Sequence, residues 1–293
     1  MPDRRGKFAG KRPSRSHICH NGCIGDESET GETMARRSTP QRTIAQIGSA
    51  ILVALALAWQ AVGGALPASL APSPEVSTAT TAAVSTPDGW QTWDEAAAPN
   101  YVREVGPAQV RKEVEPGQVC YSPLDELGRP GIVAANLTHE MREQAKERGR
   151  QDIDVDPAGW PSENPKARIE TPGGDTYSGR FWNRSHLLAD SLGGDPTREN
   201  LVTGTRMQNA GGNDNEGGMA YGEQIARAWL DGHESGTLYY SATPLYVGGE
   251  RIPRAVIVDM RSSDGSIDTE LIVYNAAKGY EVNYETGVVT RER

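Results

Sequence analysis

The sequence predicts an α+β fold in which a central antiparallel sheet is flanked by helices. Short runs of apolar and β-branched residues recur through the C-terminal part, while two other segments have helical character. Glycine-containing turns at residues 248–249, 263–265 and 286–287 separate or end several of these runs. Connections this short favour antiparallel pairing of the strands that they join.

The predicted elements follow one another in this order. Residues 132–137 are expected to form a strand, and residues 138–148 a helix that the hydroxyl of Thr138 caps. Residues 152–160 are expected to be extended, and residues 177–182 to form a strand that leads to His186. A helical stripe is predicted at Tyr221, Ile225, Ala228 and Trp229, with the helix ending near Gly232. The remaining predicted strands are 237–241, 255–260, 271–275 and 280–284.

Changes in composition divide the chain into four predicted segments. Residues 1–33 are polar and basic, and because Met34 is a second candidate start, they are interpreted as an extension that an over-extended reading frame would produce. Residues 34–71 carry arginines, then the apolar run 44–66, then small residues, which is typical of a secretory signal or an uncleaved membrane anchor. The protein is therefore expected to be secreted, or held at the membrane through residues 44–66 if these are not cleaved.

A flexible linker rich in Ala, Ser, Thr and Pro is predicted to follow the apolar run. The folded domain is expected to begin near Asp88 or as late as Pro107. With the later boundary the linker is 72–106 and the domain 107–293. A domain of that length can bury one sizeable core.

The strongest chemical signal lies between Arg180 and Glu223. Here His186 is expected at the end of a short strand, while Asn200 and Asn209 are nine positions apart and Glu223 follows fourteen later. Each residue also has an ordinary structural interpretation. The histidine could be a hydrogen-bonded structural residue, the asparagines could serve turns or caps, and the glutamate could pair with a cation one helical turn away.

Together these residues resemble a known family of enzymes. Asn183-Arg184-Ser185-His186 resembles the Asp-Arg-Gly-His signature of the DNA/RNA non-specific endonucleases, which are ββα-metal (His-Me finger) enzymes. The later asparagine and glutamate spacings are similar to those of the streptodornase-like branch, as are Leu-Asp-Glu-Leu-Gly-Arg-Pro-Gly at 124–131 and Ala-Gly-Trp at 158–160. The resemblance covers residues 119–284. It departs from the signature at Asn183 and Ser185, where the family has Asp and Gly.

The resemblance implies a ββα-metal fold and a role for each site residue. It assigns His186 as general base, Asn209 as direct ligand of Mg²⁺ (with Mn²⁺ as a substitute), Asn200 as a positioning residue, Glu223 as the partner of metal-bound water, and Arg184 as the group facing the phosphate. Independently of the resemblance, Arg180 and Arg206 belong to a cluster of arginines around this stretch and are assigned to substrate binding. These residue types suit phosphodiester hydrolysis, because neutral histidine accepts a proton near physiological pH and Mg²⁺ prefers oxygen ligands.

The reaction implied is metal-dependent hydrolysis of DNA, and of RNA as a second candidate substrate, leaving 5′-phosphate and 3′-hydroxyl ends. Two alternatives stay open. The chain could be a degenerate, non-catalytic relative that binds nucleic acid or another partner, or a nuclease toxin effector, for which a cognate inhibitor protein would be expected. Contact with a membrane is expected only through the N-terminal apolar segment.

Net charge bears on how the predicted domain would bind a polyanion. Residues 72–293 contain 21 Lys and Arg against 34 Asp and Glu, a net charge of −13. This charge disfavours tight non-specific binding to nucleic acid. Because arginines cluster around His186, local attraction is still expected there, with weak affinity and a steep dependence on salt.

Overall fold

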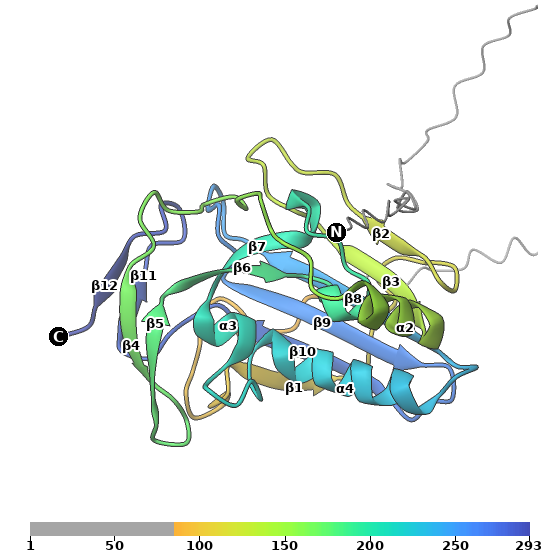
Figure 1. The fold of residues 1–293 in the computed structure, drawn as a ribbon. Coiled ribbons are helices and arrows are strands. Elements are labelled where there is room, and N and C mark those ends of the chain that lie inside the picture. Colours follow the sequence, from red (N-terminus) through yellow and green to blue (C-terminus); the bar gives the residue numbers. More distant parts are fainter. Residues whose placement is uncertain (1–84) are drawn as a thin grey trace, which may run out of the picture. The chain divides into compact units, whose positions relative to one another are not determined.

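A computed structural model of the protein describes residues 85–293 (Figure 1). Its central element is a six-stranded antiparallel sheet with the strand order β1-β10-β9-β8-β3-β2. The strands are β1 (Val102–Gly106), β2 (Val119–Tyr121), β3 (Val133–Thr138), β8 (Thr237–Leu245), β9 (Ala255–Ser262) and β10 (Asp268–Tyr274). The predicted strands at 132–137, 237–241, 255–260 and 271–275 are therefore confirmed, with some of them extending further.

Two helices cover the inner face of this sheet: α2 (His139–Arg148) and α4 (Met219–Gly232). Thr138 caps α2 as predicted, its hydroxyl accepting a hydrogen bond from the Met141 amide at 3.3 Å. Alternate residues of the strands pack against α4 in the main core, among them Leu238, Tyr240, Val258 and Met260. Burial of these apolar side chains is the main stabilising contribution on this side of the sheet.

The buried stripe of α4 differs from the predicted one. Trp229 is buried, but Tyr221 and Ala228 are exposed, and Ile225 is only partly buried. The helix instead buries Met219, Ala220, Gly222, Ala226, Trp229 and Leu230. Small residues therefore contribute much of the packed face, and Gly222 lets the sheet approach closely, since a Cβ there would lie 3.3 Å from a methyl carbon of Leu271.

Three two-stranded ladders complete the domain. They are β4 (Lys166–Glu170) with β5 (Thr176–Arg180), β6 (Trp182–His186) with β7 (Leu201–Thr205), and β11 (Tyr280–Val282) with β12 (Val289–Arg291). The short helix α3 (Arg206–Ala210) follows β7 directly, and 3₁₀ turns lie at Asp190–Leu192 and Arg198–Asn200. The predicted strand 177–182 is thus two strands with a break at Phe181. A second core forms beside β6, where Phe181, Trp182 and Ile169 are buried.

The domain begins earlier than a boundary at residue 107. Strand β1 pairs with β10 in the central sheet, and the preceding Ala98 and Tyr101 are each only 1% exposed. The ring of Tyr101 stacks on Trp93 at 4.4 Å between centroids. The linker prediction is therefore wrong for residues 85–106, because aromatic side chains scattered through an Ala- and Pro-containing stretch supply enough apolar surface to join the core.

The predictions for residues 1–84, including the signal or anchor, lie outside the described residues. Within residues 85–293, no helix is long and apolar enough to cross a membrane.

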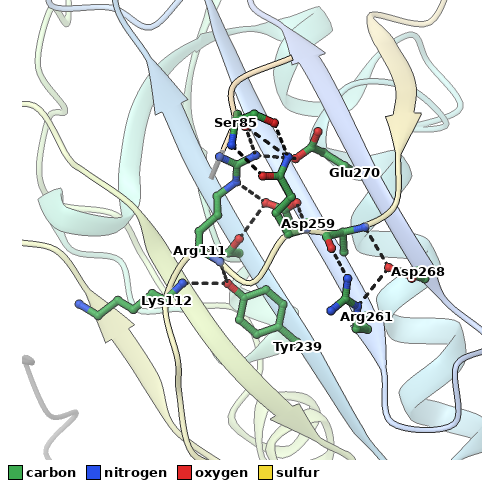
Figure 2. Close-up of polar contacts among 11 residues, drawn as sticks. Ser85, Arg111, Lys112, Tyr239, Asp259, Arg261, Asp268 and Glu270 are labelled. Atoms are coloured by element: carbon green, nitrogen blue, oxygen red, sulfur yellow. Dashed lines mark hydrogen bonds and ion pairs between the residues drawn. The ribbon is translucent and has the colours of Figure 1, made fainter. Parts of the chain in front are cut away.

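The outer face of the sheet carries a buried ion-pair cluster, which we call the Arg111 cluster (Figure 2). The guanidinium of Arg111 bonds to Asp259 on β9 at 2.6 Å and to Glu270 on β10 at 2.5 Å. Its backbone amide donates to the hydroxyl of Tyr239 on β8 at 2.9 Å. These contacts fasten the segment between β1 and β2 across three strands.

Candidate active site

The β6–β7 ladder and α3 form a compact unit that positions His186. The histidine is the last residue of β6, opposite Leu201 on β7. Gly204 on β7 allows α3 to fold back on the ladder, because a Cβ there would lie 2.0 Å from Oε1 of Gln208. The backbone of Leu187 donates to the carbonyl of Asn200 at 2.8 Å. Local sequence thus builds a rigid support for the imidazole.

The side chain of Asn200 forms hydrogen bonds to the backbone of the residues that follow His186. Its Oδ1 accepts from the Leu188 amide at 2.8 Å, and its Nδ2 donates to the carbonyls of Leu188 and Asp195 at 2.9 Å each. The residue is fully buried, so its side chain has no access to a substrate. This geometry suits the positioning role assigned to Asn200.

Four of the predicted site residues line one cavity of about 520 Å³, called here the active-site cavity. Arg184 and His186 come from β6, Asn209 from α3 and Glu223 from α4. Asn209 and Glu223 belong to consecutive helices joined by the glycine-rich segment 211–218. The fold therefore brings a base, an amide and a carboxylate to one hollow.

The environment of His186 favours its neutral form. Burial lowers the pKa of the imidazole below its ordinary value, the nearby Asp190 carboxylate opposes this shift, and Arg150 adds to it. Its Nε2 is buried and has no hydrogen-bond partner within residues 85–293. A neutral imidazole with an uncommitted nitrogen is able to accept a proton.

Glu223 is partly shielded, with 17% of its side chain exposed, and burial raises the pKa of its carboxyl against the opposing charge of Arg227. The two side chains lie 3.4 Å apart, so the helix pair predicted as the structural alternative is present. Arg227 also donates to the hydroxyl of Ser191 at 3.1 Å. The pair lines the cavity, so it does not lie on a solvated helix face.

Arg184 lines the active-site cavity, but its guanidinium is already engaged. Its Nε and Nη2 donate to Oδ1 of Asp156 at 2.9 and 2.6 Å. The same group lies 4.6 Å from the ring centroid of Trp160. A phosphate facing Arg184 would therefore have to share it with Asp156.

Arg180 and Arg206 are not among the residues that line this cavity. Arg206 lies 5.3 Å from the ring centroid of Tyr177 and donates to the carbonyl of Gly212 and to Oδ1 of Asn215, both at 3.0 Å. It thus holds the segment after α3. Arg180 lines a separate cavity of about 860 Å³ together with Trp160. Neither arginine therefore lines the cavity that contains His186.

Comparison with known proteins identifies the family. Residues 96–291 match the family model of the DNA/RNA non-specific endonucleases. The chain belongs to the DNA/RNA non-specific endonuclease family.

Individual relatives agree with this assignment. A deoxyribonuclease from Streptococcus dysgalactiae subsp. equisimilis is 31% identical over 214 residues, covering 64% of this chain and 65% of the relative, which is slightly less than two thirds of that protein's length. The solved structure of Sda1 nuclease with a bound zinc ion has a TM-score of 0.64 and 32% identity, covering 69% of this chain and 100% of that chain. NucA from Streptococcus agalactiae, solved with a magnesium ion bound, has a TM-score of 0.51 and 21% identity, covering 67% and 92%. The predicted ββα-metal fold is confirmed.

The donor atoms of this nuclease-family site fit a hard divalent cation. Asn209 offers an amide oxygen and Glu223 a carboxylate in the same cavity. Within residues 85–293, no group of three or more His, Cys, Asp or Glu residues is arranged to hold a metal ion. A cation here would therefore keep most of its positions for water and substrate oxygens, as Mg²⁺ commonly does.

Sequence reasoning missed three cations of this nuclease-family site. Arg142, Lys146 and Arg150 also line the cavity, from α2 and the residues directly after it. Arg142 and Lys146 are four residues apart on α2, which places them on one side of the helix, and that spacing was the available signal. Both pair with Asp231, and Lys146 also pairs with Glu143, so these carboxylates partly offset the positive charge that they bring to the cavity.

Proposed function

We propose that this chain is an exported, metal-dependent endonuclease that hydrolyses phosphodiester bonds of DNA, and also of RNA, without sequence specificity. One observation carries the proposal. An imidazole with an unbonded nitrogen, an amide and a carboxylate share a single cavity lined by cations. The similarity to a streptococcal deoxyribonuclease supports DNA as the main substrate. The basic and apolar N-terminal sequence supports export.

In this proposal His186 is the general base. Its lowered pKa keeps the imidazole neutral at physiological pH, so it accepts the proton of the attacking water. Asn200 fixes the chain after it and so keeps the ring in place. Arg184 and the α2 cations attract the phosphodiester and offset the charge that develops on it.

Asn209 would hold the divalent cation directly, and Glu223 would orient a water bound to it. The cation would supply positive charge beside the reacting phosphate and ease departure of the leaving oxygen. Mg²⁺ is the metal that we propose, with Mn²⁺ as a substitute, because both favour oxygen ligands. A zinc-bound relative and a magnesium-bound one make the choice of metal worth testing.

The test is cleavage of plasmid DNA and of a structured RNA by purified residues 85–293. Reactions contain Mg²⁺, Mn²⁺ or Zn²⁺, or EDTA. We expect cleavage of both substrates with Mg²⁺ or Mn²⁺ and none with EDTA. Binding of DNA without cleavage under every metal would instead indicate the non-catalytic alternative.

Asn209→Ala tests the metal assignment within the same assay. We expect activity to fall at least a hundredfold while the unfolding midpoint stays unchanged, because the side chain is partly exposed and is not one of the buried residues of the core. Arg261→Gln, on an exposed part of β9, is the matched control and should cleave normally. Wild-type rates for Asn209→Ala across a Mg²⁺ titration would show that the ligand is another residue.

A further inference from the structure

A basic surface lies on the two hairpins at one end of the domain, β4–β5 and β11–β12, which stand together in Figure 1. Lys166 and Arg168 on β4, Arg180 on β5 and Arg291 on β12 are all exposed, and we call them the hairpin surface. Lys166, Arg168 and Arg291 line a cavity of about 610 Å³ that also includes Tyr280. No carboxylate lines that cavity in the described part of the chain.

The charges of the hairpin surface are not neutralised by neighbours. Within residues 85–293, none of its four cations lies within ion-pair distance of a carboxylate, whereas Arg111, Arg129 and Arg254 are all paired. The nearby Glu170 is paired with Lys278 at 3.4 Å. Glu163 lines the neighbouring cavity that includes Arg180. Exposed Glu281 on β11 and Glu292 directly after β12 also belong to this end of the domain, but neither forms an ion pair with the four cations within residues 85–293. The surface is thus open to an anionic ligand.

Strand register adds a second argument. Lys166 lies directly opposite Arg180 across the β4–β5 ladder, so two like charges share one face. Directly opposed like charges destabilise a ladder. Ala167 and Ile169 alternate with the cations and are buried, which holds Lys166 and Arg168 outward. An anion bound between these side chains would relieve the repulsion.

The hairpin surface is continuous with the active-site cavity. Trp160 links them, because it packs against the Arg184 guanidinium on one side and lines the cavity of Arg180 on the other. Arg180 and His186 are six positions apart along β5 and β6, so the distance between their Cα atoms is at most about 20 Å at roughly 3.3 Å per residue. That length corresponds to about six base pairs of duplex at roughly 3.4 Å each.

We propose that the hairpin surface is a second binding site for the nucleic-acid substrate, which holds backbone phosphates about six base pairs from the cleaved bond. The proposal rests on the nuclease function proposed above. The contacts proposed are to phosphates, which carry no sequence information and so suit a nuclease without sequence specificity. Binding here compensates for the net negative charge of the domain.

The experiment compares a 30-base-pair duplex with an 8-base-pair duplex in which only the central phosphodiester bond can be cleaved. In the short duplex about four base pairs, roughly 14 Å, lie on either side of that bond, so it does not reach from the active site to the hairpins. The test variant is Lys166→Gln with Arg168→Gln. We expect kcat/KM on the long duplex to fall about tenfold through KM, and kcat/KM on the short duplex to change less than twofold. A plot of the logarithm of the binding constant against the logarithm of the salt concentration is measured with the long duplex in EDTA. The magnitude of its slope should decrease by about 2.

A charge-matched control is Lys112→Gln with Arg261→Gln, which removes two cations near the Arg111 cluster (Figure 2). Arg261 lies toward the end of β9 remote from the hairpins (Figure 1). The control should leave the ratio of the two kcat/KM values unchanged, and thermal unfolding midpoints should show that both variants fold.

Three outcomes overturn the proposal. The first is an equal fall on both duplexes, the second is an unchanged long-duplex KM in the test variant, and the third is an equal effect of the control variant. Failure of the parent protein to cut either duplex with any divalent metal would instead overturn the nuclease function itself. Cleavage of the short duplex by the parent therefore separates the two proposals.

Discussion

The buried polar groups of the Arg111 cluster, on the outer face of the central sheet, are hydrogen-bonded, whereas several of those around the active site are not, within the described part of the chain. On the outer face, the Arg111 side chain is 7% exposed and bonds to two carboxylates. Gln109 donates to both of these carboxylates, from its backbone amide to Asp259 and from its side chain to Glu270, at 2.8 Å each. Ser241 adds a further bond to Asp259 at 3.2 Å. Each carboxylate here accepts several hydrogen bonds, although one guanidinium faces two carboxylates, and burial together with the neighbouring Asp259 raises the pKa of Glu270.

Around the active site, by contrast, several buried polar groups have no hydrogen-bond partner within the described residues. Buried polar atoms without a hydrogen-bond partner within residues 85–293 include Nδ2 of Asn183, Oγ of Ser185, Nε2 of His186 and both amide atoms of Gln208. All lie on β6 or α3. Unpaired buried polar groups cost stability, and in native proteins each calls for an explanation.

This difference indicates that the Arg111 cluster stabilises the fold, whereas the β6–α3 unit serves the proposed reaction. The Arg111 cluster fastens the N-terminal part of the domain to the sheet, so its worth is structural. The β6–α3 unit retains unpaired groups near the proposed chemistry, where reactivity requires a nitrogen that is not already bonded. Stability and function can therefore be perturbed separately, and the following experiments test this.

The largest expected effect is that of His186→Gly. Removing the proposed base should lower kcat by about three orders of magnitude, within the usual range for general base catalysis. The unfolding midpoint should change little, because the histidine is only partly buried and its Nε2 has no hydrogen-bond partner within residues 85–293. Added imidazole should restore part of the rate in proportion to its concentration. A stable variant that cuts at the normal rate would exclude this base.

Arg111→Met should have the opposite effect, lowering stability while leaving activity unchanged. Two carboxylates would remain buried without their cation, so the free energy of unfolding should fall by about 3–5 kcal/mol. Urea denaturation measures this loss, and kcat of the protein that remains folded should be normal. Adding Asp259→Asn and Glu270→Gln should recover much of the stability. A loss of activity without a loss of stability would link the cluster to catalysis.

The pH dependence of the cleavage rate should reflect the protonation of His186. The base works when deprotonated, so the rate should be constant above its pKa and fall about tenfold per pH unit below it. Because burial lowers this pKa, the acidic limb should lie below the ordinary imidazole value. Arg150→Gln should move the limb upward, since Arg150 lowers the pKa. Arg261→Gln is the control, and a limb that Arg150→Gln shifts downward would contradict the assignment.

The smallest effect is expected for Gln208→Met. The substitution keeps the volume and removes a buried amide whose two polar atoms have no partner within residues 85–293. The free energy of unfolding should rise by up to about 1 kcal/mol, and kcat should change by no more than a few fold. Chemical denaturation and steady-state kinetics measure the two effects. A clear loss of stability would show that the amide is satisfied, for example by an enclosed water.

Much of the fold followed from local pattern. Strands bounded by glycine turns, the Thr138 cap and the end of α4 at Gly232 were predictable, since each depends on a few neighbouring residues. The exposed positions on α4 were not predictable, because Tyr221 satisfies helical periodicity equally well on a face that meets no partner. The early start of the domain was missed because composition averages conceal single aromatic residues such as Tyr101.

The sequence by itself determined the family and the order of its motif residues, because identity and spacing along the chain are sequence properties. It could not determine which cations reach the cavity. Arg142 and Lys146 enter it because α2 packs beside α4, whereas Arg206 is drawn away to Tyr177. Only the tertiary structure decided these placements, since the direction of a long side chain depends on partners distant in sequence.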